Sequence, residues 1–149
     1  MGVDDCVSER ALREIYLRGF EIAIKSAEPY SIMTSYNLIN GVHTVNNKDL
    51  CTTLAREEWG FDGVIMTDWS TTTPDGGSIS WKCAEAGNDI IMPGCPDDDK
   101  NIRMALKDGL LSEDNIRTSA ERVIALVKKM ERLERFSVFI EIENICLIL

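Results

Sequence analysis

The sequence contains little histidine, little basic charge and no paired cysteines, and each shortage argues against a class of function. His43 is the only histidine, so a histidine-rich metal centre is excluded, and no G-x-S-x-G segment is present to form a nucleophile elbow. The five cysteines are irregularly spaced and include no C-x-x-C pair. Neither a disulfide framework nor a zinc site is therefore expected, and we predict no metal.

Basic residues are outnumbered by acidic ones, 16 to 25, which gives a net charge of −9. Because a phosphate backbone selects clustered Lys and Arg, we expect no nucleic-acid partner. The first ten residues lack the basic and apolar regions of a signal peptide. The apolar segment 137–149 is too short for a membrane span and contains Glu141 and Glu143. These features predict a cytoplasmic protein that does not associate with membranes.

What the chain does contain is enough apolar material for one domain with a core, since 44% of its 149 residues are hydrophobic. Short apolar strands recur every 25 to 30 residues and alternate with amphipathic helices. This rhythm predicts an α/β fold with parallel strands, either a doubly wound sheet or a (β/α)8 barrel. We expect strands at 31–37, 64–68 and 88–94, helices at 8–27, 48–59, 81–86, 99–108 and 113–135, a polar loop at 37–47 and a solvated loop at 97–99.

The last predicted helix, 113–135, has an apolar stripe whose spacing matches the helical period. A stripe of this kind usually packs on a sheet, so we expect it to be part of the core. The stripe consists of Ile116, Ala120, Val123, Val127 and Met130.

One acidic residue stands at a place where α/β proteins carry out chemistry. Asp68 ends the predicted strand 64–68, and active sites of parallel sheets lie at the carboxyl ends of the strands. Trp69 follows with an aromatic face, and Tyr36 and Asn37 end the preceding strand. Together these residues are typical of a carbohydrate-sized polar cup with an apolar wall. The pattern alone leaves two interpretations of Asp68 open, a helix cap and a catalytic residue.

Four longer segments carry a family resemblance. In chain order they read "VSERALREIYLRGFEIAIKSA", "IMTSYNLINGV", "LAREEWGFDGVIMTDWS" and "AGNDIIMPG". The chain resembles glycoside hydrolase family 3, especially its β-glucosidases, from about Val7 to Arg135. The resemblance does not extend to the remaining carboxyl-terminal residues.

The resemblance implies roles for four residues. The aspartate of the T-D-W motif, here Asp68, is the nucleophile of a retaining glycosidase in that family, and the positions of Met33, Tyr36 and Trp69 line the sugar subsite. Neither a metal nor an organic cofactor is needed for this mechanism. Because side chains alternate along a strand, Met33 and Tyr36 cannot both point inward from a regular strand, so we expect a bend at the strand end.

The resemblance also implies missing parts. In the family, the acid/base usually comes from a following α/β sandwich domain, and a Lys-His pair comes from earlier barrel strands. Neither is identifiable in this chain. A whole barrel has eight βα units, whereas about three strands are predicted here. We therefore expect a partial (β/α)8 barrel with flanking helices, residues 1–136 being the carboxyl-terminal portion of the family's N-terminal catalytic domain and 137–149 a non-family apolar tail.

An open sheet edge beside an apolar tail is an aggregation hazard unless another chain covers it, so association with a missing domain or self-association is expected. The predicted function is hydrolysis of terminal β-D-glucosyl residues from small or oligosaccharide β-glucosides with retention of configuration. Two alternatives stay open. One is β-xylosidase or β-N-acetylglucosaminidase specificity on the same scaffold, and the other is a non-catalytic truncated remnant or assembly module.

Overall fold

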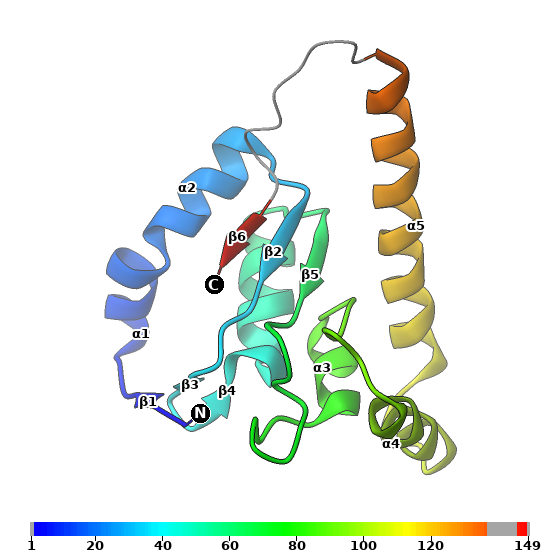
Figure 1. Ribbon diagram of the computed structural model, residues 1–149. Coiled ribbons are helices and arrows are strands. Elements are labelled where there is room, and N and C mark those ends of the chain that lie inside the picture. Colours follow the sequence, from blue (N-terminus) through cyan, green and yellow to red (C-terminus); the bar gives the residue numbers. More distant parts are fainter. Residues whose placement is uncertain (1, 137–145, 149) are drawn as a thin grey trace.

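The computed structural model describes residues 2–136 and 146–148, with side chains described through residue 132. Strands β2 (Ser31–Met33), β5 (Val64–Met66) and β6 (Cys146–Ile148) form a parallel sheet in the order β5-β2-β6 (Figure 1). Ser31 pairs with Val64 and Met33 with Met66, so β2 and β5 end at the same level. The predicted α/β class with parallel strands is therefore confirmed, as a fragment with few strands.

The predicted strand at 88–94 is much shorter than expected. It forms a single parallel bridge from Ile90 to Met66. Backbone bonds also join Asp89 N to Ile65 O at 2.7 Å and Thr67 N to Ile90 O at 2.9 Å. The ladder ends there because the Met92 N–H donates to the Thr67 side chain instead of a strand carbonyl. The following residue, Pro93, has no N–H to donate.

The helices lie close to their predicted positions. Ser8 caps the first one, its Oγ accepting from Ala11 N at 3.2 Å. An i→i+5 bond from Leu17 N to Leu12 O, 2.8 Å long, then widens the turn and divides the predicted single helix. The helical segments are α1 (Glu9–Ala11), η1 (Leu12–Tyr16), α2 (Arg18–Ala27), η2 (Thr44–Asn46), η3 (Asp49–Glu58), α3 (Ser80–Ala86), α4 (Pro96–Lys107) and α5 (Glu113–Phe136).

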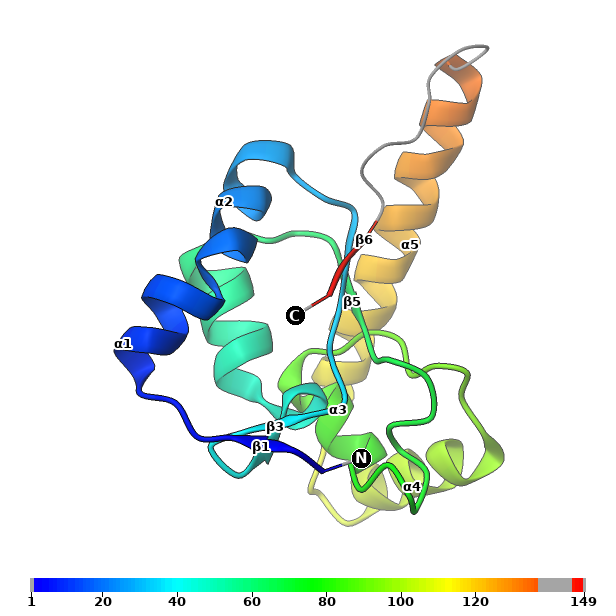
Figure 2. The same cartoon turned by 60° about the vertical axis from the view of Figure 1, so that its left-hand side comes forward.

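The main core lies between the sheet and the helices η1, α2 and η3. Figures 1 and 2 show α1 and α2 to one side of the sheet and α5 to the other. Burial of apolar side chains at this interface is the chief stabilising contribution expected for the fragment. The buried members are Leu17, Ile24, Ile32, Leu50, Cys51, Leu54, Ala55, Trp59, Phe61 and Ile65.

The predicted solvated loop at 97–99 is wrong, because these residues form the first turn of α4. Pro96 occupies an early helical position, where its missing N–H has no intrahelical partner to lose. Asp98 is buried, and its carboxylate accepts hydrogen bonds from Ser80 Oγ and Cys95 N. The acidic residue therefore caps α4 and ties it to α3.

The predicted burial of the α5 stripe is also wrong for part of its length. Val127 is 52% exposed, and Ala120 is exposed as well. The described sheet is too narrow to cover the helix, and polar contacts attach it instead. Ser119 Oγ and Arg122 Nη1 both donate to Asp89 Oδ1 at 3.1 Å.

A small sheet replaces the predicted polar loop at 37–47. Strand β1 (Asp4–Asp5) pairs in parallel with β3 (Leu38–Ile39), which pairs antiparallel with β4 (Val42–His43). The hairpin turn is Asn40-Gly41, with φ of 50° and 83°. An Asn-Gly pair between short apolar runs is a strong hairpin signal, so the sequence carried this information.

Candidate active site

The backbone beyond β2 and β5 holds Asp68 at the carboxyl edge of the sheet. Thr34 N donates to Met66 O at 2.9 Å, and Asp68 N donates to Thr34 O at 3.1 Å. Strand pairing thus continues past the last regular residue of each strand. Asp68 is consequently fixed beside the end of β2, at the edge where parallel sheets place their sites.

The Asp68 carboxylate accepts a backbone hydrogen bond and lies close enough to the Tyr36 phenol to act on it. It is half-buried, and its Oδ1 accepts from Trp69 N at 2.7 Å. The Asp68 side chain also interacts with the Tyr36 phenol. The pKa of Tyr36 is raised above its usual value, first by desolvation and then by the hydrogen bond and negative charge of Asp68. The phenol therefore stays neutral beside the carboxylate.

The expected bend after β2 is present. The strand ends at Met33, and the chain bends at Tyr36 and Asn37. This bend brings the Tyr36 hydroxyl to Asp68 although a regular strand would alternate its side chains. Met33 is half-buried and pairs with Met66 across the ladder. The structure thus brings Tyr36 close to Asp68. It places Met33 at the end of β2, beside Met66 of β5.

Trp69 and the loop that follows complete the candidate site. Trp69 is 58% exposed, so its ring has a free face. Ser70 adopts a φ of 62°, which is uncommon for a residue with a side chain, and its N–H donates to Met92 O at 2.8 Å. Further along, Ser78 Oγ donates to Thr71 O at 2.7 Å. These bonds close the loop on itself behind Trp69.

Sequence reasoning missed three polar residues directly behind Asp68. Thr34 and Thr67 are fully buried and Asn88 is 2% exposed. Thr34 and Thr67 each follow the last residue of an apolar strand, and Asn88 precedes the apolar run that starts at Ile90. A polar residue in such a position is the one signal that could have identified them, because buried polar groups require specific partners.

In the part of the chain that the structure describes, no group of three His, Cys, Asp or Glu side chains is arranged to bind a metal ion. A search of the same residues for a helix with the length and apolarity of a membrane span finds none. The described free cysteines are the buried Cys51 and Cys83 and the exposed Cys6 and Cys95. Burial raises the pKa of both buried thiols to about 12, so they stay protonated at neutral pH.

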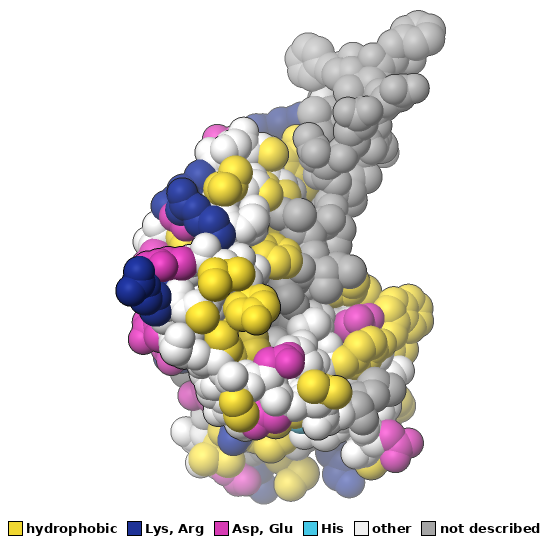
Figure 3. All heavy atoms as spheres, turned by 90° about the vertical axis from the view of Figure 1, so that its left-hand side faces the viewer, with side chains coloured by type: hydrophobic (Ala, Val, Ile, Leu, Met, Phe, Trp, Pro, Cys, Tyr) yellow, Lys and Arg dark blue, Asp and Glu magenta, His cyan; other side chains and the backbone are white. Residues whose placement is uncertain are grey.

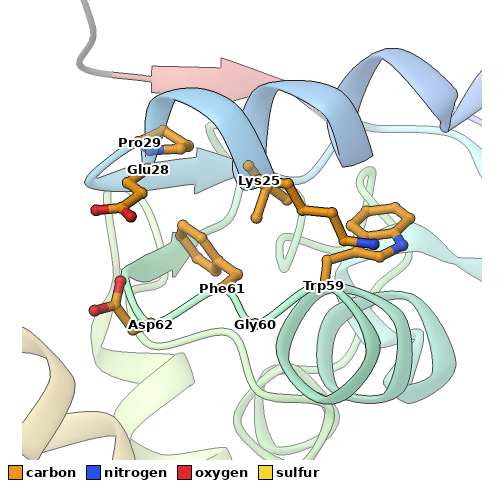
Figure 4. Close-up of a pocket in the computed structure, with 8 residues that line it drawn as sticks. Lys25, Glu28, Pro29, Trp59, Gly60, Phe61 and Asp62 are labelled. Carbon is orange, nitrogen blue, oxygen red and sulfur yellow. The ribbon is translucent and has the colours of Figure 1, made fainter.

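Two hollows lie away from Asp68. One, of about 280 Å³, is at the amino ends of β2 and β5, where Trp59 and Phe61 form its walls (Figure 4). Parallel sheets rarely place chemistry at this end. The second, of about 490 Å³, lies between helices α1 to α2 and strands β1 and β3. On this face, hydrophobic side chains gather beside basic and acidic ones (Figure 3).

Comparison with known proteins gives this geometry a context. Residues 2–126 match the family model described as the glycosyl hydrolase family 3 N-terminal domain. The chain is 44% identical over 127 residues to an exo-α-(1→6)-L-arabinopyranosidase of Bifidobacterium longum, covering 85% of this chain and 16% of the relative. It is 38% identical over 141 residues to a β-glucosidase of Ruminococcus albus, covering 89% of this chain and 15% of the relative.

The chain is also similar in structure to solved β-glucosidases. β-Glucosidase 3B from Thermotoga neapolitana in complex with glucose superposes with a TM-score of 0.76 at 43% identity, covering 84% of this chain and 18% of that one. A family 3 β-glucosidase of Bifidobacterium adolescentis gives a TM-score of 0.77 at 37% identity, covering 87% of this chain and 18% of that one. The chain thus spans less than a fifth of the length of these relatives.

The comparisons also correct one expectation. The chain was expected to be a carboxyl-terminal part, but the family model that matches is that of the N-terminal domain. The boundary predicted at residue 136 stays a prediction, and the predicted tail lies outside the described residues apart from β6. Because the family model covers residues 2–126, the chain belongs to glycosyl hydrolase family 3, through that family's N-terminal domain.

Proposed function

We propose that Asp68 is the nucleophile of a retaining β-glycosidase that removes terminal β-D-glucosyl residues. The observation that carries the proposal is the half-buried Asp68 carboxylate at the carboxyl edge of the sheet, which accepts from Trp69 N and lies beside the Tyr36 phenol. The backbone donor gives the carboxylate a defined orientation. A carboxylate held in this way is suited to attack a carbon that develops positive charge.

In the proposed mechanism, one oxygen of Asp68 attacks the anomeric carbon while the bond to the leaving oxygen breaks. The product of this step is a covalent glycosyl ester, which water then hydrolyses with net retention. A second carboxyl group, about 5 to 5.5 Å from the nucleophile in retaining enzymes, must protonate the leaving oxygen. We infer that this acid/base is supplied by a part of the protein outside this chain, because the chain spans 15% to 18% of its relatives.

We propose that Met33, Tyr36 and Trp69 line the subsite for the terminal sugar. Trp69 has an exposed ring that suits the apolar face of a pyranose, and Tyr36 adds a hydroxyl beside the reacting carbon. The solved relative described in complex with glucose supports a glucosyl substrate. No step of this mechanism calls for a metal or an organic cofactor.

A second specificity has an observation of its own. One relative is named an exo-α-(1→6)-L-arabinopyranosidase, which acts on a pyranoside that lacks the hydroxymethyl group. This observation favours pentopyranosides, including β-xylosides, as the alternative, while β-N-acetylglucosaminides stay an alternative from the sequence alone. A panel of aryl glycosides assayed on the protein combined with its remaining domains separates them. The substrate with the highest kcat/KM decides among them.

The parallel strands fit a segment of a (β/α)8 barrel that further strands complete, and we propose that the chain associates either with those parts or with itself. The open edge of the described sheet beside β5, where the third segment forms only a single bridge, supports this, because unpaired strand edges favour pairing with further strands. The cytoplasmic location stays a prediction. The alternative, a non-catalytic remnant or assembly module, predicts no hydrolysis of aryl glycosides even when the chain is combined with the remaining domains.

Mechanism-based labelling tests the nucleophile. The protein, alone and combined with the missing domains, is incubated with an aryl 2-deoxy-2-fluoro-β-glucoside, which traps the glycosyl ester. Peptide mapping is expected to find the sugar on Asp68, and Asp68→Asn is expected to abolish the label. Asp62→Asn, at the opposite end of β5, is the matched control and should label normally. Labelling at another carboxylate would overturn the assignment.

Turnover by the isolated chain tests the source of the acid/base. We expect very weak hydrolysis of aryl β-glucosides, or none, because protonation of the leaving oxygen is missing. Turnover close to that of a full-length relative, abolished by Asp68→Asn, would show that the chain or its oligomer supplies the acid.

A further inference from the structure

Three buried polar side chains lie directly behind Asp68: Thr34 and Thr67 follow the last residues of β2 and β5, and Asn88 precedes the third pairing segment. Thr34 Oγ1 donates to Asn88 Oδ1 and also lies 3.2 Å from Met66 O. Asn88 Nδ2 donates to Val45 O at 2.7 Å. On the other side of β5, Thr67 Oγ1 accepts from Met92 N at 2.9 Å. The two threonines stand where the regular ladder of their own strand ends, and Asn88 stands just before the third segment begins to pair.

These side chains lie in an interior with almost no water contact. Thr34 and Thr67 are 0% exposed and Asn88 is 2% exposed. Burying a hydroxyl or an amide costs free energy unless its hydrogen bonds are satisfied. An aliphatic residue of similar shape at each position would fill the space without that requirement. The polar choice therefore demands an explanation beyond packing.

The bonds converge on the backbone that carries Asp68. Thr34 offers its carbonyl oxygen to Asp68 N at 3.1 Å, while its own hydroxyl is held by the Asn88 side chain. Downstream of Asp68, Ser70 N donates to Met92 O, and Met92 N is held by Thr67. Asp68 is thus fixed from both directions along the chain. Neither route includes the Asp68 carboxylate itself.

We propose that Thr34 and Asn88 are positioning residues for Asp68, and that Thr67 supports them from the opposite strand. The pair holds the Thr34 carbonyl in the place where it receives the Asp68 N–H, which sets the distance from the Asp68 carboxylate to the Tyr36 hydroxyl. For catalysis, the inference rests on the proposed nucleophilic role of Asp68. The positioning of Asp68 by Thr34 and Asn88 does not depend on whether Asp68 is the nucleophile.

The first test measures geometry without turnover. Thr34→Val keeps the shape of the side chain and removes the hydroxyl, whereas Thr34→Ser retains it. Thr52→Val is the matched control, since Thr52 Oγ1 donates to Ala86 O at 2.9 Å, away from the contacts around Asp68. Amide hydrogen exchange at Asp68 and the Tyr36 titration, followed by NMR of ring-labelled tyrosine, are recorded for each variant.

We expect Thr34→Val to speed exchange at Asp68 by about tenfold, as loss of one buried hydrogen bond implies. In the same variant the pKa of Tyr36 should move down toward 10.0, because the Asp68 carboxylate is no longer held against it. Thr34→Ser and Thr52→Val should retain the wild-type values. Unchanged values in Thr34→Val, or equal changes in Thr52→Val, would overturn the proposal.

Asn88→Asp is a second variant in case Thr34→Val fails to fold. A carboxylate has nearly the same shape but cannot donate to Val45 O, so the same two readouts should change in the same direction. Failure of Asn88→Asp to change either readout would also contradict the proposal.

A labelling rate connects positioning with chemistry. In the protein combined with its missing domains, the rate at which the fluoroglucoside labels Asp68 should fall about tenfold in Thr34→Val and recover in Thr34→Ser. The apparent Kd for the label should stay unchanged. If the label is found elsewhere while the exchange and titration results hold, the proposed function fails and the positioning inference stands. If the label is found on Asp68 while the exchange and titration results fail, the positioning inference fails and the proposed function stands.

Discussion

The phenol of Tyr36 interacts with the side chain of Asp68 across the carboxyl ends of β2 and β5. The contact joins two residues 32 positions apart, and it depends on a bend that follows Met33. Desolvation, and then the Asp68 side chain, raise the pKa of the Tyr36 phenol above its ordinary value of 10.0, so the phenol stays neutral. This relationship makes the titration of Tyr36 a direct probe of the candidate site.

Asp68→Asn is expected to lower the pKa of Tyr36 toward its ordinary value of 10.0. The substitution removes the negative charge that disfavours the phenolate, although desolvation, the larger cause, remains. Ultraviolet or NMR titration of the tyrosines measures the change, with Asp62→Asn as the control. An unaltered Tyr36 titration would contradict the contact.

The contribution of the Tyr36 phenol to the free energy of unfolding should change with pH only in the alkaline range. The pKa of Tyr36 in the folded state lies above its unfolded value, so the folded state retains the proton longer. Its contribution is therefore complete below about pH 10 and is lost as the pH rises through the folded pKa. Tyr36→Phe should lose less stability than wild type between about pH 9 and pH 11. Thermal unfolding across that range measures the difference.

Much of the fold and of the site followed from the sequence for definite reasons. Strand alternation and the carboxyl-end rule make Asp68 a candidate, and parity predicts a bend at the end of the strand that contains Met33. Helix caps such as Ser8 are local signals and were read correctly. The role that the resemblance gives to Asp68 stays a prediction.

Other features depend on partners that are distant in the sequence. The bond between Thr34 and Asn88 joins residues 54 positions apart, so no local pattern shows it. The short third segment ends because Met92 N turns to the Thr67 hydroxyl, a choice made only in three dimensions. The Asn40-Gly41 hairpin is different, since its signal is local: an Asn-Gly pair between short apolar runs indicates a hairpin rather than the predicted loop.

Asp89 is predicted to be important for stability. Its side chain is fully buried and bonds Arg56 Nη2 at 2.7 Å, Ile65 N at 2.9 Å and Arg122 Nη1 at 3.1 Å. Arg56 is itself only 8% exposed, and burial lowers its pKa. Asp89→Asn leaves that guanidinium without its counter-charge. We expect the free energy of unfolding to fall by about 3 kcal/mol or more.

The control for Asp89 is an exposed pair. Arg103 Nε lies 2.8 Å from Asp99 Oδ2, with side chains 75% and 63% exposed. Arg103→Gln should change the free energy of unfolding far less than Asp89→Asn does, because solvent screens the exposed pair. Urea denaturation compares the two variants. Similar small effects in both would show that Asp89 is not a central contact.

Strand β6 is predicted to protect the edge of β2. It pairs in parallel with β2 on the side opposite β5, from Ser31 with Cys146 to Met33 with Ile148. Deleting residues 146–149 would leave the N–H and C=O groups of that edge open to another chain. We expect faster aggregation, measured by light scattering during refolding at several concentrations. Equal scattering by the shortened and complete chains would contradict a protective role.

The loop behind Trp69 offers the sharpest steric test. A Cβ added to Gly76 would lie 2.2 Å from Thr71 O and 2.6 Å from Ser70 O, both backbone atoms that cannot move alone. Gly76→Ala should therefore displace the loop, lower stability by about 1 to 3 kcal/mol and change the fluorescence of the exposed Trp69. Gly19→Ala is the matched control, since a Cβ there meets nothing within 4 Å in α2. That variant should gain up to about 1 kcal/mol from helix propensity and leave the Trp69 signal unchanged. If Gly76→Ala behaves like Gly19→Ala, the loop is not packed as described, and its support of Ser70 next to the candidate nucleophile is lost with it.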